Sequence, residues 1–254
     1  MKRTFAVGDI HGDSEALDRV LAKLPELSAY DTIVFLGDYI DRGPDSRGVC
    51  ERVRALPGRT AARVIALRGN HEDAWLRCID EEPHLGFLMP IQNGCREMFR
   101  SLMGRPRLGD DEELQADELA EYLDVKRWFP PDLAAWMREL PLWHEDEFAI
   151  YVHAGLDGEG HQWRHPQDGR PNQLLWMREP DFYANYRGKR VVFGHTPVKD
   201  LPRDHENPEA QALGDTTDVW WRGDLVGIDT GAGKGGHLSI LELPTLRVYE
   251  SRDE

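Results

Sequence analysis

Short apolar runs alternate with amphipathic segments in the first third of the chain. The runs Thr4–Val7, Thr32–Leu36 and Arg63–Leu67 are rich in β-branched and aromatic residues, which is typical of buried strands. The segments between them, Ser14–Leu24 and Ser46–Leu56, have apolar residues at the spacing of one helix face. Strands and helices that alternate in this way predict a layered α/β fold.

The starts of these two helices are predicted at Ser14 and Ser46, since a serine N-cap accepts a hydrogen bond from the first turn. The pattern then changes, because His84–Leu140 is acidic and has helical periodicity. We therefore expect a helical insertion at about 84–140 within a single domain spanning 1–254. Later strand-like runs predict a second sheet packed on the first: Glu147–Val152, Val191–Phe193, Leu225–Ile228, Leu238–Leu241 and Arg247–Tyr249.

A polar cluster follows each of the first three predicted strands. The clusters read GDIHGD from Gly8, GDYIDRG from Gly37 and RGNHE from Arg68. Because open α/β sheets bind ligands beyond the carboxyl ends of their strands, the three clusters are predicted to meet in one crevice. A solvated turn would explain any single cluster, so the prediction rests on the set. We interpret Asp45 as a solvated turn or a charge at a helix N-terminus, without a catalytic role.

The charge of the chain restricts its partners. A net charge of −15 repels nucleic acid and anionic membranes, so neither is expected as a main partner. The chain has no apolar run near the roughly 18 residues of a membrane span, and its first residues do not resemble a secretory signal, so we expect a cytoplasmic protein. Cys50, Cys78 and Cys95 have no C-x-x-C spacing, which argues against a disulfide framework or a zinc–thiolate site.

The polar clusters contain oxygen and nitrogen ligands for metal ions. Asp9 and His11 are two residues apart, so an extended backbone directs both side chains the same way. A carboxylate and an imidazole suit a first-row divalent ion, and Asp38 from the next cluster could bridge two ions. The complete set of predicted ligands is Asp9, His11, Asp38, Asn70, His153 and His195. This set predicts two divalent ions, with Mn²⁺ favoured and Fe or Zn²⁺ as alternatives.

Five motifs, GDIHGD, GDYIDRG, RGNHE, HAG and GHTP, together resemble those of the PPP-type serine/threonine protein phosphatases. The similarity is to the bacterial and phage members of this family, within the calcineurin-like metallophosphoesterases. It covers the chain from about residue 5 to about residue 240 and is weakest over His84–Leu140. The resemblance implies two packed β-sheets flanked by helices, an α/β/β/α sandwich.

The resemblance also implies roles for individual residues. Asp9 and His11 would hold the first metal ion, Asp38 would bridge both ions, and Asn70, His153 and His195 would complete the second. Asn70 would also contact the substrate phosphate. The non-metal roles carried over are His71 as general acid, Asp41 as its orienting partner, and Arg42 and Arg178 as phosphate ligands; Arg178 rests on the shorter match LLWMREP.

Together these features predict a dimetal-dependent phosphomonoesterase that hydrolyses phosphoserine or phosphothreonine in proteins, by attack of a metal-bridging hydroxide. Phosphotyrosine is an open alternative substrate. The main competing hypothesis is a dinucleoside polyphosphate hydrolase, for example one acting on diadenosine tetraphosphate. The dinucleoside polyphosphate hydrolases that share these motifs have Ala in place of Asp41 and GNHD in place of GNHE. By this resemblance, Asp41 and Glu72 favour the phosphatase. A catalytically silent scaffold is a third hypothesis, but it would be expected to lack a ligand.

The segment GAGKGG (Gly231–Gly236) matches the spacing G-x-G-x-x-G. It leads into a strand-like run instead of a helix, and Gly235 stands where a P-loop has Ser or Thr, so a nucleotide-binding loop is not expected. We predict a turn at the mouth of the site. Whether Lys234 or His237 contacts the substrate there is left open by the sequence.

Overall fold

A five-stranded sheet contains the amino-terminal strands. The computed structural model describes residues 2–81, 93–109, 112–202 and 217–252. The strand order of this sheet is β12-β11-β1-β2-β3, in which β1, β2 and β3 are parallel and β11 is antiparallel to β1 and β12. The bounds are β1 Thr4–Val7, β2 Thr32–Phe35, β3 Arg63–Ala66, β11 Ser239–Leu243 and β12 Arg247–Glu250.

A second five-stranded sheet is formed by the later strands in the order β4-β5-β8-β10-β9. Its three central strands β5, β8 and β10 are parallel, and the edge strands are antiparallel to their neighbours. The bounds are β4 Trp143–Glu145, β5 Ile150–Val152, β8 Val191–Phe193, β9 Trp220–Arg222 and β10 Leu225–Gly227. A short hairpin, β6 Gly158–Glu159 with β7 Gln162–Trp163, lies outside this sheet.

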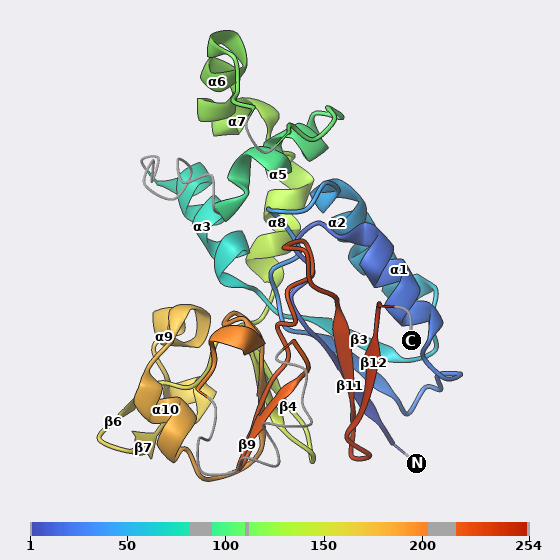
Figure 1. Ribbon diagram of the computed structural model, residues 1–254, viewed down its shortest axis with the longest axis vertical. Helices are drawn as coiled ribbons and strands as arrows, with labels where there is room; N and C mark the ends of the chain where they lie inside the picture. Colours follow the sequence, from blue (N-terminus) through green and yellow to red (C-terminus); the bar gives the residue numbers. More distant parts are fainter. Residues whose placement is uncertain (1, 82–92, 110–111, 203–216, 253–254) are drawn as a thin grey trace.

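The two sheets pack face to face, and helices cover their outer faces (Figure 1). Successive side chains of a strand point to opposite faces. Accordingly Phe5 and Val7 of β1 pack in the core beneath the helices, whereas Ala6 packs between the sheets with Tyr151 and Val192 of the second sheet. This is the α/β/β/α arrangement predicted from the sequence. The covering helices are α1 Ser14–Ala22 and α2 Ser46–Ala55 on the first sheet, and α9 Pro171–Trp176 and α10 Pro180–Asn185 on the second. The helix α3 Asn70–Asp80, which follows β3, packs beside the helices of the insertion.

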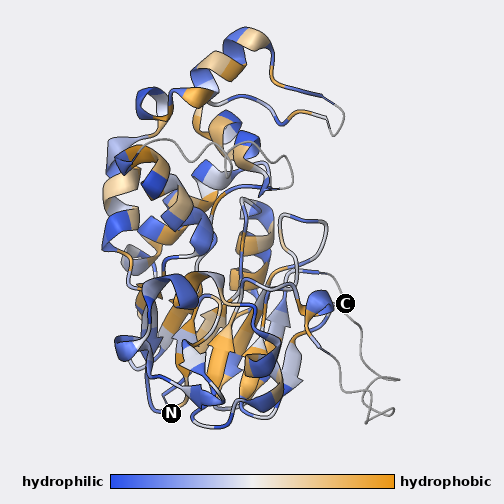
Figure 2. Cartoon of the chain, turned by 90° about the vertical axis from the view of Figure 1, so that its left-hand side faces the viewer, coloured by the Kyte–Doolittle hydropathy of each residue, from blue (hydrophilic) through white to orange (hydrophobic). Residues whose placement is uncertain are grey.

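The described part of the predicted insertion contains four helices, which lie beyond one end of the sheets, at the top of Figure 1. They are α5 Cys95–Leu102, α6 Ala116–Leu123, α7 Val125–Trp128 and α8 Pro131–Glu139. Trp75 of α3 packs edge-on against Trp128 of α7, with ring centroids 5.2 Å apart, and so joins these helices to the main core. Figure 2 shows hydrophobic strands in the interior and both hydrophobic and hydrophilic residues on these helices. The predicted segment 84–92 lies outside the described residues.

The predicted N-cap residues were wrong by one position. Asp13 caps α1 by accepting a hydrogen bond from the Ala16 amide, and Asp45 caps α2 by accepting from the Gly48 amide. The carboxylate satisfies the free amide in each case. The hydroxyl of Ser46 instead accepts a hydrogen bond from the amide of Asp41, and therefore supports the turn that carries a predicted site residue.

Two further differences concern the later strands. The predicted strands at Leu238–Leu241 and Arg247–Tyr249 do not belong to the second sheet, because β11 and β12 extend the first sheet beside β1. The strand predicted from Glu147 begins only at Ile150, because Asp146 accepts hydrogen bonds from the amides of Phe148 and Ala149 and closes a turn there. None of the helices in the described ranges is long and apolar enough to cross a membrane.

Candidate dimetal and phosphate site

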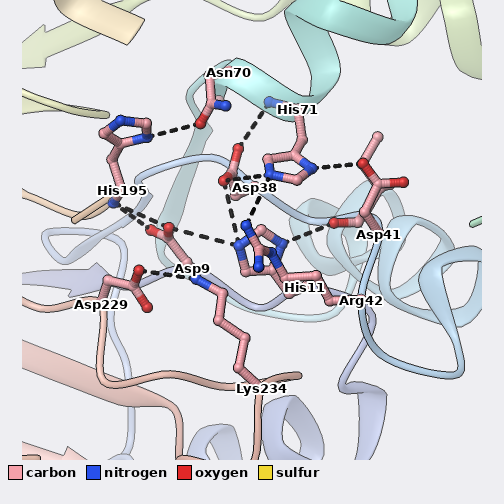
Figure 3. Close-up of polar contacts among 12 residues, drawn as sticks. Asp9, His11, Asp38, Asp41, Arg42, Asn70, His71, His195, Asp229 and Lys234 are labelled. Carbon is pink, nitrogen blue, oxygen red and sulfur yellow. Dashed lines mark hydrogen bonds and ion pairs between the residues drawn. The ribbon is translucent and has the colours of Figure 1, made fainter. Parts of the chain in front are cut away.

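The six predicted metal ligands meet at the carboxyl ends of parallel strands from both sheets. Such ends are where α/β sheets bind their ligands. Figure 3 shows the predicted ligands from four of these ends directed toward one another. The ligands are Asp9 and His11 after β1, Asp38 after β2, Asn70 at the start of α3, His153 after β5 and His195 after β8.

Asp38 lies at the centre of this cluster. Its Oδ2 atom is 3.4 Å from His11 Nε2, and its Oδ1 atom is 3.5 Å from His153 Nε2. Asp38 belongs to two groups of residues whose ligand atoms all lie within 4.8 Å of one another inside each group: His11, Asp38 and His71 in one, and Asp9, Asp38 and His153 in the other. A carboxylate shared by adjoining groups has the position expected of a bridging ligand.

Backbone carbonyl groups orient two of the histidines. Nδ1 of His11 is 2.9 Å from the oxygen of Ile40, and Nδ1 of His153 is 2.9 Å from the oxygen of Leu36. A carbonyl oxygen only accepts, so Nδ1 carries the proton and Nε2 presents a lone pair toward Asp38. Second-shell bonds of this kind commonly hold metal-binding histidines.

The cluster contains too many acceptors for its donors. Nε2 of His11 is buried without a hydrogen-bond partner in the described part of the chain. Nε2 of His153 is 2.8 Å from Oδ1 of Asn70, so two acceptors face each other. Nδ1 of His195, whose Nε2 accepts from Arg178, donates to this oxygen at 2.8 Å. Cations held beside the lone pairs of His11 and His153 would satisfy them, so these residues fit a metal site.

Burial keeps the histidines neutral. It lowers the pKa of His11 and His195 well below the usual value and also lowers that of His153. Neutral imidazole is the form that binds a metal ion. Burial raises the pKa of Asp9 well above its usual value, and the nearby charges of Asp229 and Asp38 add to this effect. A cation would offset that repulsion, which again fits a metal site.

The backbone is strained where these side chains converge. Positive φ is uncommon for residues other than glycine and costs roughly 1–3 kcal/mol at each position. Most of the non-glycine residues with positive φ belong to the predicted site: His11 (47°), Asp38 (54°), Asp41 (68°), Arg42 (68°) and His195 (64°). The surrounding fold therefore forces the backbone into conformations that direct these side chains inward.

His71 and Asp41 form a hydrogen-bonded pair beside the cluster. Nδ1 of His71 is 2.5 Å from Oδ2 of Asp41, and both side chains are buried. The indole Nε1 of Trp75 donates to Asp41 as well, at 3.0 Å to Oδ1. The carboxylate thus fixes the ring, and Nε2 of His71 faces Asp38 at 3.8 Å and Arg42 Nη2 at 3.5 Å. Sequence reasoning predicted the pair but not the contribution of Trp75.

Glu72 holds two of the strand-end turns together. Its buried carboxylate accepts hydrogen bonds of 2.9 Å from the amides of Gly69, Asp38 and Tyr39. These donors lie after β2 and before α3, so the side chain ties the Asp38 turn to the start of the helix that carries Asn70 and His71. The sequence motif GNHE contains Glu72, but this connection could be found only from the structure.

The two arginines predicted to bind phosphate line one pocket next to the cluster. Nε of Arg178 donates to Nε2 of His195 at 3.0 Å, and Nη2 donates to the carbonyl oxygen of the same residue at 3.3 Å. Arg178 therefore reaches the cluster from the segment between α9 and α10, whereas Arg42 reaches it from the turn after β2. The structure brings together all ten residues that were predicted for the site.

Asp229 was missed by the sequence interpretation. It follows β10, at the same kind of strand end as the predicted ligands, and its side chain is fully buried. Lys234 pairs with it, with 3.1 Å between Nζ and Oδ2. Asp229 could have been predicted from the polar cluster DTG that follows the apolar run Leu225–Ile228, because this order repeats the pattern of the earlier motifs.

Comparison with known proteins gives four results. The family model for calcineurin-like phosphoesterases matches residues 2–226. The chain is 28% identical over 247 residues to serine/threonine-protein phosphatase 1 of Salmonella typhimurium, covering 95% of this chain and 92% of that protein. It is 24% identical over 298 residues to a symmetrical bis(5'-nucleosyl)-tetraphosphatase of Dechloromonas aromatica, covering 97% and 95%. A crystal structure of a putative diadenosine tetraphosphatase shares the fold, with a TM-score of 0.63, 20% identity, and coverage of 98% and 92%.

Proposed function

The chain belongs to the calcineurin-like phosphoesterase family, and on this premise we propose that it is a phosphomonoesterase acting on phosphoserine and phosphothreonine in proteins. It is a phosphoester hydrolase with a His/Asp cluster suited to metal ions. What we propose beyond the family is the substrate class and the role of each residue in the site.

The proposal assigns the metal ions to the six predicted ligands, with Asp38 between them. Two divalent ions there would lower the pKa of the attacking water and neutralise the phosphoryl oxygens. Arg42 and Arg178 bind the remaining phosphoryl oxygens by charge-assisted hydrogen bonds. In this structure Arg178 donates to His195, and the proposal requires its guanidinium group to turn toward the substrate when a phosphate enters.

His71 supplies a proton to the leaving oxygen in this proposal. Serine and threonine leave as alkoxides, which are poor leaving groups unless protonated. Asp41 accepts from Nδ1 of His71 and so leaves Nε2 as the atom that transfers the proton. This pair is the observation that carries the proposal, because a proton donor fixed by a buried carboxylate is most valuable for an alkyl phosphate.

A second candidate is the hydrolysis of dinucleoside tetraphosphates. The similarity to a bis(5'-nucleosyl)-tetraphosphatase over nearly the whole chain supports it. Asp41 and Glu72 support the first candidate, since those relatives are expected to have Ala and Asp at the two positions. The phosphate-binding residues would serve either substrate.

One assay separates the two candidates. Metal-stripped protein is restored with Mn²⁺ and given a phosphothreonine peptide, a phosphotyrosine peptide or diadenosine tetraphosphate, and products are quantified. We expect phosphate release from the phosphothreonine peptide at the highest kcat/KM, with the dinucleotide spared. Preferential cleavage of the dinucleotide would reject the protein phosphatase and leave the second candidate. No activity on any phosphoester with restored metal would reject both.

A further inference from the structure

The pocket beside the metal cluster contains more basic groups than one phosphate requires. Its volume is about 510 Å³, and it opens from the cluster toward the segment Gly231–Gly236. The net charge of the chain is −15, yet basic side chains outnumber acidic ones in this lining. The charged lining residues are Arg42, Arg178, Lys199 and Lys234, with Asp200 and Asp229.

Lys234 is held at the inner part of this pocket. Its ammonium group is 3.1 Å from Oδ2 of the buried Asp229, whose other oxygen accepts from the amide of Gly231 at 3.1 Å. An ammonium group has three donors. The described ranges of the chain assign it no acceptor other than Asp229. Lys234 can therefore keep this partner and still donate to an anion in the pocket.

The loop that carries Lys234 is closely packed against the cluster. Gly233 has a φ of +69°, and a Cβ atom there would lie 2.2 Å from the carbonyl oxygen of His11. The amides of Lys234 and Gly236 both donate to the oxygen of Gly231, at 3.0 and 2.9 Å. Figure 3 shows the side chain extending toward Asp9 and Asp229 from the side opposite His71. The loop therefore fixes the ammonium group at the edge of the site.

We propose that Lys234, with Lys199 at the rim, forms a second anion subsite for a negatively charged group next to the scissile phosphate. This inference rests on the proposed phosphoesterase function. Arg42 and Arg178 are assigned to the scissile phosphate, so the two lysines are available for its neighbour. Lys199 is exposed on the short 3-10 helix Val198–Asp200 and lines the same pocket.

The ligand chemistry of this subsite is a second acidic group carried by the same substrate. In a phosphopeptide this would be the carboxylate of a neighbouring Asp or Glu. In a nucleotide it would be the next phosphate of the chain. Both groups accept hydrogen bonds from an ammonium ion, so the choice between them is made by the experiment.

The test compares substrates matched in all but the second charge. One pair is a phosphothreonine peptide with neutral neighbours and the same peptide with aspartates; the other pair is AMP and ADP. Wild-type protein and Lys234→Met are assayed with Mn²⁺. For each pair, the ratio of interest is kcat/KM for the substrate with the second charge divided by kcat/KM for the substrate without it. In Lys234→Met this ratio should fall about tenfold for at least one pair, because one charge-assisted hydrogen bond is lost. The loss should appear as a higher KM. The pair that responds identifies the source of the second anion.

Two other variants complete the design. Lys199→Met removes an exposed charge at the rim, and the same ratio of kcat/KM should fall about threefold in this variant. Lys126→Met, on α7 and outside this pocket, should leave both ratios unchanged. An unchanged ratio in both Lys234→Met and Lys199→Met would overturn the subsite. Equal losses on all substrates in Lys234→Met would also overturn it, because Lys234 would then act through Asp229. Wild-type protein inactive on every one of these substrates would reject the proposed phosphomonoesterase function on which the subsite rests.

Discussion

The hydrogen bond between His71 and Asp41 joins the first turn of α3 to the turn after β2, which are adjacent only in the folded chain. Asp41 is also held by Trp75 Nε1 and, through its amide, by Ser46. Burial raises the pKa of Asp41, and the hydrogen bond to His71 opposes that shift. Asp41, held through both its carboxylate and its backbone amide, therefore orients one imidazole ring, which is the arrangement that a directed proton donor needs.

His71→Asn should lower the turnover of alkyl phosphates about 10²- to 10⁴-fold, because an amide cannot protonate the leaving alkoxide. p-Nitrophenyl phosphate has an acidic phenol as its leaving group and should be affected much less. The measurement is kcat on both substrates, with metal content determined on the same samples. Retained metal with a selective loss supports the proton-donor role. Equal losses on the two substrates would contradict it.

At the scale of the elements, the helix α5 reaches into the site from the predicted insertion. The amide of Arg42 donates to the carbonyl oxygen of Gly94 at 3.0 Å, and Sγ of Cys95 is 3.9 Å from Oδ2 of Asp41. Asp41 and Arg42 both have positive φ, so this contact supports a strained turn. The start of α5 therefore helps to position two predicted site residues.

Gly94→Ala should weaken this support. A Cβ atom at Gly94, where φ is +67°, would lie 2.2 Å from the amide nitrogen of Arg42, so the turn must shift. We expect kcat/KM for a phosphopeptide to fall at least about tenfold, since small displacements of positioning groups have large effects. Gly104→Ala is the matched control, because its φ is +66° and no atom lies within 4 Å of the added carbon.

The control should lose about 1 kcal/mol of stability from backbone strain and retain its activity. Urea unfolding of both variants measures that cost, and steady-state kinetics measures the effect on the site. If both glycine variants lose activity equally, strain alone explains the result and the contact with Arg42 has no special role.

The sequence predicted those elements whose signal is local. The runs Thr4–Val7 and Val191–Phe193 became strands with the predicted bounds. The sheet to which a strand belongs depends on distant partners, so the pairing of β11 with β1 was not predicted. The candidate metal ligands at strand ends were predicted because each follows an apolar run. The contact of Gly94 with Arg42 was not predicted, because neither residue type indicates that the other is its partner.

At the scale of the whole molecule, the fold concentrates charge at the junction of its two sheets. Asp9, Asp38 and Asp229 are buried there at the ends of β1, β2 and β10. Burying like charges together is unfavourable unless cations accompany them. The packing of the rest of the chain therefore compensates for a site that is destabilising when it lacks metal ions.

Addition of Mn²⁺ to the metal-stripped protein should consequently raise its melting temperature. An ion that binds only the native state, at a concentration about 100 times its Kd, adds about 2.7 kcal/mol, which for a chain of this size corresponds to about 5–10 °C. Asp38→Asn is the control: it removes the shared carboxylate and one buried charge. Mn²⁺ should no longer raise the melting temperature of this variant. An equal Mn²⁺ response in both proteins would place the stabilising ions elsewhere on this acidic chain and contradict the bridging position of Asp38.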